Sequence, residues 1–480
     1  MIYLEENLLT KFLKLMSKEI SESDLELVPL GRSLGLDLIS FSKLRDSQDD
    51  VFIDRVRNEA LKRLAKSNDN VVSNNYSFYA GSVDFMVSNN LENKEFFLLE
   101  TNGGSNRGLS ILTKKQQAIL YDGYYESISQ AIAKSKEENE KILVLVGVPF
   151  NDGLIHEKVI MVEYLRKKIK FRGYTLKIFN SENYNKEHEA KVVFIISDYK
   201  KLSQILSFSN GWIWYQGERV HVLIGDGIAR RLNDIKFDEL MRKDFRRINT
   251  IIVNPIFKIT DDKSLTYAAS FLSKNVLEKY KLKYLIFNKA YDEQDLNHKV
   301  KKLIKEHKKT FIIKPRGGSG GAGVIPIFTG ENSEGIIKII EESKKEFYNK
   351  FSRNREPFPY TIQEKADFSL INWENSKHTF DLRIYLAQIN EIIVPIGGLA
   401  RIARGTYIKG LEKQEFVVNL SGYDGKIEVK RGVGFSEENS KLLELNFEDF
   451  INVFCLGSVI FKSIIENYNK IMEFSDWERV

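Results

Sequence analysis

Residues 311–324 read FIIKPRGGSGGAGV, and this segment constrains the fold and the chemistry of the chain more than any other. An apolar β-type run ends at Lys314-Pro315 and leads into six residues, of which four are Gly. Such a loop can bring backbone N–H groups close to phosphate oxygens, because Gly has no Cβ and tolerates positive φ. Lys314, at the strand end, would add a positive charge for the same phosphates. The segment therefore predicts a hairpin that covers phosphates.

Other kinds of Gly-rich loop fit less well. Gly318, Gly320 and Gly323 match the G-x-G-x-x-G of dinucleotide sites, but that motif needs a helix directly after the loop, and here the β-type run VIPIF follows. A P-loop needs Gly-Lys-Ser/Thr at its end, where this chain has Val324. A protein kinase has its Lys on a strand after the loop, and the sequence contains neither His-Arg-Asp nor Asp-Phe-Gly. A hairpin without a ligand is the plain alternative, and the Lys-Pro-Arg approach is unusual for a simple turn.

Composition excludes several classes of protein. The 480 residues suffice for about two to four domains, and the 29% charged and 42% apolar residues are typical of a soluble globular protein. The single cysteine, Cys455 in VFCLGSVIF, rules out an intramolecular disulfide and a Cys-cluster metal site, and its setting favours a buried packing role. The net charge of +6 is modest, so we expect an anionic ligand in one cleft rather than a nucleic-acid partner.

The sequence gives no sign of membrane insertion. The start, MIYLEENLLTKFLKLMSKEI, has early acidic residues and no long apolar core, unlike a signal peptide. No run approaches about 18 uninterrupted apolar residues. We therefore expect no membrane partner and a cytoplasmic location.

Alternating strand and helix patterns predict a small α/β layer domain at residues 140–255. Its first strand, KILVLVGVP, is almost continuously apolar, as in a strand buried on both faces. The predicted elements are strands at 141–149, 174–179, 191–198 and 212–216, with a helix at 154–171.

The following part of the chain is more mixed. Residues 261–280 are expected to be helical and lead to short strands and the Gly loop. Ser333 can cap a helix with apolar residues at helical spacing, IIKIIEESKKEFYNKF. Strands prevail after residue 360, and residues 446–471 are expected to be mostly helical.

A second group of polar residues lies far upstream, in GSVDFMVSNNLENKEFFLLETNGG. Asp84 ends one β-type run, and Glu100 and Asn102 end the next, FFLLETN. Alternate residues of a strand share a face, so two strands joined by a turn at residues 89–94 could present all three side chains together. Their oxygens are the hard ligands that Mg²⁺ prefers. The polar end of an ordinary hairpin is the alternative for this segment taken alone.

Together these motifs resemble the ATP-grasp ligases of the glutathione-synthetase-like kind, over about residues 75–430. The metal-holding element, which comes last in that family, comes first here, as in circularly permuted ATP-grasp proteins. The resemblance implies an α/β ATP-grasp fold, circularly permuted, with an added Rossmann-like α/β pre-ATP-grasp domain. It also implies a division of the chain: 1–139 with the permuted metal part, 140–255 for substrate, 256–440 with the nucleotide subdomains and the lid, and 441–480 as C-terminal helices.

The resemblance implies a nucleotide site with two phosphate-binding Lys residues. Lys263, in DDKSLTYAASF, matches the first and Lys314 the second, although an exposed Lys at a helix start is the alternative for Lys263. The lid contributes Gly318, Ser319, Gly320 and Gly321. The metal ligands of the family match Asp84, Glu100 and Asn102.

Further matches imply the adenine, ribose and phosphoryl contacts. The hinge, whose backbone would contact the adenine edge, matches Gln363, Glu364 and Lys365, and the Asp-x-Arg strand near ribose and phosphates matches Asp381 and Arg383. The catalytic group near the transferring phosphoryl and the acyl phosphate matches Arg401, Arg404 and Asn419. A simple salt bridge is the alternative for Arg404, and Gly422 follows Asn419 by three positions where the family has four.

The substrate pocket is less defined by the sequence. Arg230 and Arg231, in GIARRLND, resemble a paired-Arg element of the permuted family and could clamp a substrate carboxylate, with a structural role as the alternative. His156-Glu157 starts a helix where an anion could dock, although the sequence favours a plain helix start for this pair. Trp212 and Trp214 are expected to be packing residues.

The resemblance implies an enzyme that uses ATP and Mg²⁺ to activate a small-molecule carboxylate as an acyl phosphate and transfers it to an amine or a peptide. Phosphoryl transfer needs charge neutralisation and positioning rather than a protein nucleophile, which agrees with the low His and Cys content. Two alternatives stay open: transfer to a carrier-protein thiol, and a nucleotide-binding scaffold without turnover. Relatives commonly form homodimers, so a homodimer is a further expectation.

Overall fold

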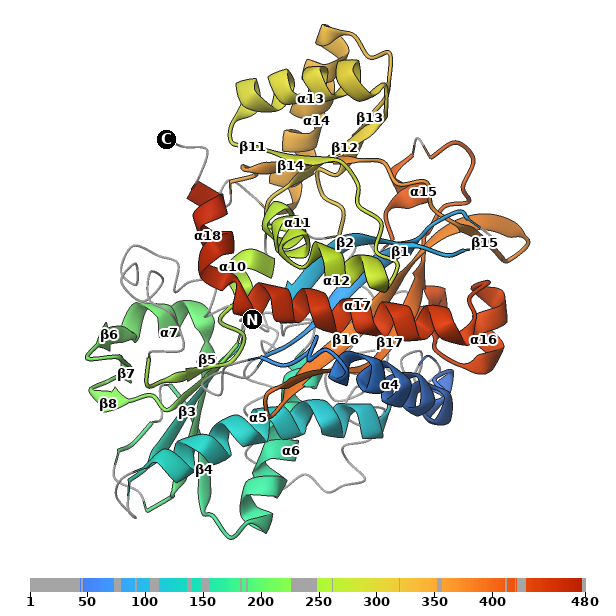
Figure 1. Ribbon diagram of the computed structural model, residues 1–480. Coiled ribbons are helices and arrows are strands. Elements are labelled where there is room, and N and C mark those ends of the chain that lie inside the picture. The colour runs from blue at the N-terminus through green and yellow to red at the C-terminus, as the bar shows by residue number, and fades with distance from the viewer. Residues whose placement is uncertain are drawn as a thin grey trace, which may run out of the picture.

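The chain has a mixed α/β fold with several sheets, seen in a computed structural model (Figure 1). The structure describes residues 44, 46–72, 79–90, 93–103, 112–135, 140–148, 155–181, 184–186, 189–225, 248–260, 262–318, 320–351, 356–410, 412–418, 420 and 429–476. In this part of the chain, no helix has the length and apolar character needed to cross a membrane.

The central layer is a six-stranded sheet of order β18-β17-β16-β1-β2, with β15 paired to β16. Its strands are β1 (Ala80–Val87), β2 (Phe96–Gly103), β15 (Leu370–Trp373), β16 (Ser376–Ile389), β17 (Ile392–Ile402) and β18 (Gly432–Gly434). All pairings within it are antiparallel, and β1 aligns Asp84 with Arg383 of β16. The N-terminal hairpin therefore lies beside strands almost 300 residues further along the chain.

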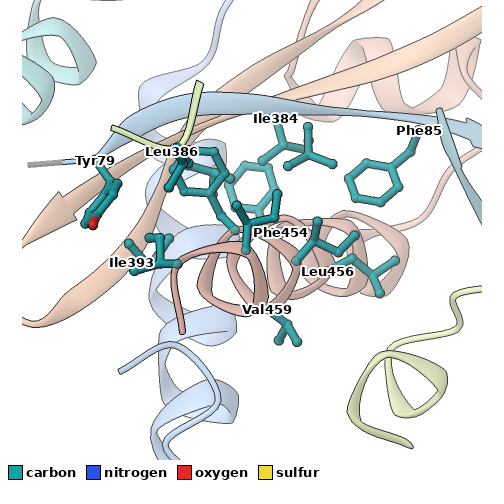
Figure 2. Packing of buried hydrophobic residues seen from close by; sticks show 14 of the residues in the cluster. Tyr79, Phe85, Ile384, Leu386, Ile393, Phe454, Leu456 and Val459 are labelled. Atoms are coloured by element: carbon teal, nitrogen blue, oxygen red, sulfur yellow. The ribbon is translucent and has the colours of Figure 1, made fainter. Parts of the chain in front are cut away.

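Two helices bury one face of this sheet. Helix α17 (Phe447–Glu466) is buried along nearly its whole length, and α4 (Asp50–Ala65) packs against it. Figure 2 shows Phe454 and Leu456 of α17 turned toward Phe85, Ile384 and Leu386 of the sheet. The N-terminal and C-terminal parts of the chain thus share one hydrophobic core.

A second sheet is parallel, with the order β10-β9-β3-β5-β4. Its strands are β3 (Ile142–Val148), β4 (Leu176–Asn180), β5 (Val192–Asp198), β9 (Val222–Ile224) and β10 (Ile251–Ile252). The accompanying helices are α5 (Lys114–Lys134), α6 (Ile155–Phe171) and α7 (Tyr199–Ile205). Strands β3 and β5 are buried at every position, as the continuous apolar runs predict. Helix α5 also packs on β16 and β17 and so joins the two sheets.

Residues 212–216 form a strand, as predicted, but this strand does not join the parallel sheet. They form β7 (Trp212–Tyr215) of a small antiparallel sheet with β6 (Ser207–Ser209) and β8 (Glu218–Arg219). Two tight turns cause this, because Asn210-Gly211 and Gln216-Gly217 all have positive φ, the conformation of two-residue hairpin turns. A parallel neighbour would need a much longer crossover.

The third sheet has the order β11-β14-β12-β13. Its strands are β11 (Phe287–Ala290), β12 (Phe311–Pro315), β13 (Ile325–Ile327) and β14 (Tyr360–Glu364). The Gly loop joins β12 to β13, which are antiparallel, so the predicted strand–loop–strand arrangement is confirmed. Helices α13 (Glu293–His307) and α14 (Ser333–Phe351) pack with one face of the sheet in a separate apolar cluster, seen at the top of Figure 1.

Short helices connect these layers. They are α10 (Phe257–Thr260), α11 (Lys263–Leu272), α12 (Lys274–Lys279), α15 (Lys413–Phe416), α16 (Glu437–Leu442), α18 (Tyr468–Asp476) and a 3₁₀ turn at Val429–Arg431. The helix expected at 261–280 is divided because Ser273, with φ −116° and ψ 22°, leaves the helical conformation. Asn467 divides the C-terminal helical segment in the same way.

Candidate active site

Four buried charged residues from three adjacent strands form the floor of the site. Arg383 Nε and Nη2 donate to the two Asp84 oxygens at 2.8 and 2.7 Å. Arg401 Nη2 donates to Asp84 Oδ2 at 2.7 Å, and its Nε donates to Asp381 Oδ1 at 2.8 Å. The two positive and two negative charges balance, which a cluster this deeply buried requires.

The two carboxyl groups of this cluster differ in their pKa. Burial opposes ionisation of Asp84, but Arg383 and Arg401 outweigh it and lower the pKa of Asp84 to about 2. Burial raises the pKa of Asp381 to about 6, against the effect of Arg401. Asp84 therefore stays ionised down to a lower pH than Asp381.

These contacts do not support the metal role predicted for Asp84. Asp84 is fully buried and accepts three hydrogen bonds from guanidinium groups, which leaves a lone pair of Oδ1 as the main free position for a metal ion. In the described ranges, no group of three or more His, Cys, Asp or Glu side chains is arranged to hold a metal. Asp84 instead fixes two arginines.

Glu100 and Asn102 fit a metal better. They lie on β2, opposite Asp84 and Ser82 of β1, and are only partly buried. The Asn102 side-chain nitrogen donates weakly to Asp84 Oδ2 at 3.5 Å, which leaves its oxygen as a potential ligand. Mg²⁺ is often held by one or two carboxylates together with substrate phosphates, and Glu100, whose Oε2 also faces Lys263 Nζ at 3.0 Å, is the one carboxylate of this pair.

Lys263 connects this hairpin to the Gly loop. Its Nζ lies 3.0 Å from Glu100 Oε2 and donates to the Gly318 carbonyl oxygen at 3.4 Å. Residues from three distant segments of the chain therefore meet at one ammonium group. The N-terminal hairpin does return against the Gly loop, as the rotated motif order predicts.

Lys314, at the end of the strand that leads into the loop, is buried among polar groups. Its Nζ donates to Tyr267 Oη at 3.2 Å and to Gln363 Oε1, and Tyr267 Oη donates to the Leu99 carbonyl oxygen at 2.6 Å. Burial, together with the charge of Lys263, lowers the pKa of Lys314 to about 7, although Glu100 opposes this. Such a lysine has lost much of its hydration and gains from a phosphate partner.

Lys289 is a site residue that the sequence interpretation missed. Lys289 and Lys314 both pair with Thr361, from opposite sides of β14, so the two lysines project from the same face of the sheet. Lys289 is 3% exposed, and its Nζ lies 3.3 Å from Asp262 Oδ2. Its signal was a lone Lys in the short β-type run YLIFNKA, where a purely structural strand favours apolar residues.

The hinge differs in detail from the prediction. The Glu364 N–H donates to the Ile286 carbonyl oxygen at 2.8 Å and the Lys365 N–H to that of Thr310 at 2.9 Å, so neither is available to an adenine. Within the described ranges, the N–H of Ala366 has no partner. A cavity of about 700 Å³ begins at this point, and its lining includes Ala366, Phe368, Leu370, Tyr407, Lys365 and Lys377.

The glycines of the lid are required by its geometry. Gly317, Gly320, Gly321 and Gly323 have φ between 62° and 72°. A Cβ at Gly321 would lie 2.5 Å from Val417 Cγ1, and one at Gly323 would lie 2.8 Å from the Ser343 carbonyl oxygen. The loop therefore lies tightly against neighbouring segments at Gly321 and Gly323.

The remaining predicted residues are either away from this cluster or outside the described ranges. Arg404 is exposed, in the loop after β17. Ser319, Asn419, Arg230 and Arg231 lie outside the described residues, as do the side chains of His156 and Glu157.

Comparisons with known proteins give likenesses in structure only. No family model and no curated protein sequence matches the chain. A gamma-glutamylcysteine synthetase candidate from Methylobacillus flagellatus KT has a TM-score of 0.44 and 10% identity, covering 90% of this chain and 96% of its own. A glutathione synthetase-like effector from Globodera pallida has a TM-score of 0.36 and 13% identity, with 76% and 82% covered. D-alanyl-alanine synthetase A from Vibrio cholerae has a TM-score of 0.30 and 11% identity, with 66% and 81% covered.

The names of these three structural neighbours are those of synthetases or of a synthetase-like protein. With identities of 10 to 13% and TM-scores below 0.5, the likenesses by themselves assign neither an activity nor a substrate to this chain.

Proposed function

We propose that this protein is an ATP-dependent carboxylate–amine ligase with a circularly permuted ATP-grasp fold. The observation that carries the proposal is the meeting of Glu100, Lys263 and Gly318 at one ammonium group. It supports a single site built from a carboxylate for metal, a cation for phosphate and a Gly-rich lid. The proposed division follows the motifs, with residues 1–139 and 256–440 forming the ATP-grasp part, 140–255 the substrate domain and 441–480 the C-terminal helices.

The triphosphate of ATP would lie between the lid and the polar face of the four-stranded sheet. Lys289 and Lys314 project from that face, and the positive-φ glycines leave the lid backbone accessible to phosphate oxygens. The adenine would occupy the cavity that begins at the hinge, with the Ala366 N–H as donor and Phe368 and Tyr407 among its walls. This replaces the Glu364 and Lys365 donors of the sequence prediction.

Glu100 and Asn102 would hold Mg²⁺ together with the nucleotide phosphates. When bound, the ion neutralises charge on the phosphates during transfer. Asp84 has a different part: it keeps Arg383 and Arg401 charged and aligned at the floor of the site. Arg401, on the strand next to β16, would then stabilise the transferring phosphoryl group.

The proposed reaction has two steps. A substrate carboxylate oxygen attacks the γ-phosphorus of ATP, and the bond from that phosphorus to the β–γ bridging oxygen breaks. The products of this step are ADP and an acyl phosphate. A neutral amine then attacks the acyl carbon and expels inorganic phosphate, and the amine loses a proton. The closed lid excludes water, which would otherwise hydrolyse the acyl phosphate.

The parallel sheet is the proposed source of substrate contacts. In open α/β sheets, ligands bind beyond the carboxyl ends of the strands, where β3 and β9 end at Val148 and Ile224. Arg230 and Arg231 follow β9 in the sequence, and we assign them the substrate carboxylate.

The test is release of ADP and phosphate from ATP in the presence of Mg²⁺ and a panel of amino acids and short peptides. Acceptor-dependent ADP release with formation of an amide supports the proposal. ATP binding with no ADP release for any acceptor would contradict it and favour a scaffold. Turnover only with a carrier-protein thiol would replace the amine by a thiol. Lys314→Ala and Glu100→Ala should each abolish turnover in a folded protein.

A further inference from the structure

The C-terminal end of the Gly lid, at Gly323, is hydrogen-bonded to helix α14. The Gly323 N–H donates to Glu346 Oε2 at 3.0 Å, and the Ser343 hydroxyl donates to the Gly323 carbonyl oxygen at 2.6 Å. Ser343 is fully buried, and there is no space for a Cβ at Gly323. Both backbone groups of Gly323 are therefore engaged, and its N–H is not available to a phosphate.

Glu346 has a second partner, Lys413, in a segment that packs on a different sheet. Lys413 Nζ lies 2.5 Å from the same Oε2 atom, although the two residues are 67 positions apart. Helix α14 packs on β12 and β13 of the four-stranded sheet, whereas α15, which carries Lys413, contacts β16 of the six-stranded sheet. Glu346 Oε2 thus contacts both the Gly lid and Lys413. Through it the four-stranded sheet, which carries the lid, is linked to the segment around α15 beside the six-stranded sheet.

Lys413 lies in a segment, residues 408–410 and 412–417, that is held by several hydrogen bonds and that we call the wall. Glu415 Oε2 accepts hydrogen bonds from the N–H groups of Ile408, Lys409 and Gly410, at 2.8, 2.9 and 2.7 Å. These bonds lower the pKa of the buried Glu415 to about 2, against the effect of burial, so the carboxylate stays ionised. From this wall Val417 touches the lid at Gly321. Lys413 therefore offers a fixed point to which the lid can be fastened.

We propose that Glu346 and Lys413 form a clasp that holds the Gly lid closed and sets the rate at which a bound nucleotide leaves. The inference rests on the proposed nucleotide site. Glu346 is a positioning residue, because it acts on the nucleotide only through Gly323. Opening the lid must break the ion pair with Lys413 or the bond to Gly323.

Removal of the clasp should have a different effect from removal of an ordinary surface ion pair. A solvent-exposed pair is worth little, and its loss would leave the lid unchanged. Here the side chains are 34% and 21% exposed, and the oxygen also accepts from the lid backbone. We therefore expect nucleotide release to become about three- to tenfold faster when either charge is removed, the range for a partly shielded charged hydrogen bond.

The experiment uses the full-length protein with Mg²⁺ and a mant-labelled ATP analogue. Release is measured by stopped-flow displacement with unlabelled ATP for Glu346→Gln, Lys413→Met and the exchanged pair Glu346→Lys/Lys413→Glu. Both single variants should release the analogue faster. The exchanged pair should recover only in part, because it restores the ion pair but not the acceptor for Gly323.

Two controls separate the possible failures. Glu342→Gln, an exposed residue on the same helix, should match the wild type. Amide hydrogen exchange across the lid, without nucleotide, should be faster in the two single variants and unchanged in the control. If the wild type binds no adenine nucleotide, the proposed function fails, and lid exchange still tests the clasp. Unchanged release and unchanged lid exchange in both single variants would overturn the clasp.

Discussion

Asp84 lies directly opposite Arg383 in the pairing of β1 with β16, and its carboxylate accepts two hydrogen bonds from that guanidinium. The residues are 299 positions apart in the chain. The bond therefore ties the N-terminal hairpin to the centre of the fold, and the second guanidinium, from Arg401, adds to this. A residue predicted as a metal ligand is thus part of the structural floor of the site.

Asp84→Asn should destabilise the protein strongly, because it leaves two buried guanidinium groups with only Asp381 to balance them. Loss of one partner from a buried charge network costs about 3–5 kcal/mol. Asp381→Asn should cost less, since Asp381 contacts one arginine and burial already raises its pKa to about 6. Urea denaturation followed by circular dichroism measures both. An equal or smaller loss for Asp84→Asn would contradict this account.

Gly321→Ala should weaken nucleotide binding by forcing the lid away from its wall. The new Cβ would lie 2.5 Å from Val417 Cγ1, and φ of +72° adds about 1–2 kcal/mol of backbone strain. A tenfold or greater rise in the Kd for ATP is expected, which calorimetric titration can measure.

The matched control for this substitution is Gly330→Ala. Gly330 also has positive φ, at +105°, but no atom lies within 4 Å of its Cβ position, so it carries the strain without the clash. The control should leave the Kd unchanged. Val417→Ala added to Gly321→Ala should recover part of the affinity, and no recovery would show that contact with the wall is not the cause.

The part of the site that could be predicted from the sequence is the part that local chemistry determines. A strand that ends in Lys before a Gly-rich segment predicts a hairpin, and the pairing of Phe311 with Ile327 confirms its strand–loop–strand geometry. The return of Glu100 to the lid was also predictable, because the motif order demanded it. Both predictions depend on short segments whose residue types have few alternative uses.

Other features depend on contacts between distant segments and left no local signal. A carboxylate on a strand can bind a metal or an arginine equally well. The sequence therefore could not show that the Asp84 carboxylate accepts its hydrogen bonds from Arg383 and Arg401. The position of Lys289 beside Thr361 is a property of strand register. Likewise, the Glu364 N–H was unavailable for adenine only because Ile286 lies next to it.

Removing the charge of Lys289 should weaken nucleotide binding without unfolding the protein, provided that its partner is neutralised as well. The double variant Lys289→Met/Asp262→Asn avoids an unpaired buried charge, and Asn can still cap helix α11. We expect at least a tenfold rise in the Kd for ATP, since a charge-assisted phosphate contact is lost. Lys344→Met/Glu293→Gln removes another ion pair of the same subdomain and should change the Kd less than about twofold. Equal effects of the two double variants would exclude Lys289 from the site.

Nucleotide binding should take up a proton at Lys314 above pH 7. In the ligand-free protein the pKa of Lys314 is about 7, so at pH 8 the Lys314 amine is uncharged in most molecules. Phosphates favour the charged form and raise its pKa, so binding draws a proton from solvent, and affinity falls as pH rises, by up to about tenfold per unit. Calorimetric titrations with ATP at pH 8, in two buffers of different ionisation enthalpy, should show uptake approaching one proton. Lys314→Arg, which stays charged, should remove the uptake, whereas Lys338→Met, at an exposed position on α14, should retain it. Uptake that persists in Lys314→Arg would assign the proton to another group.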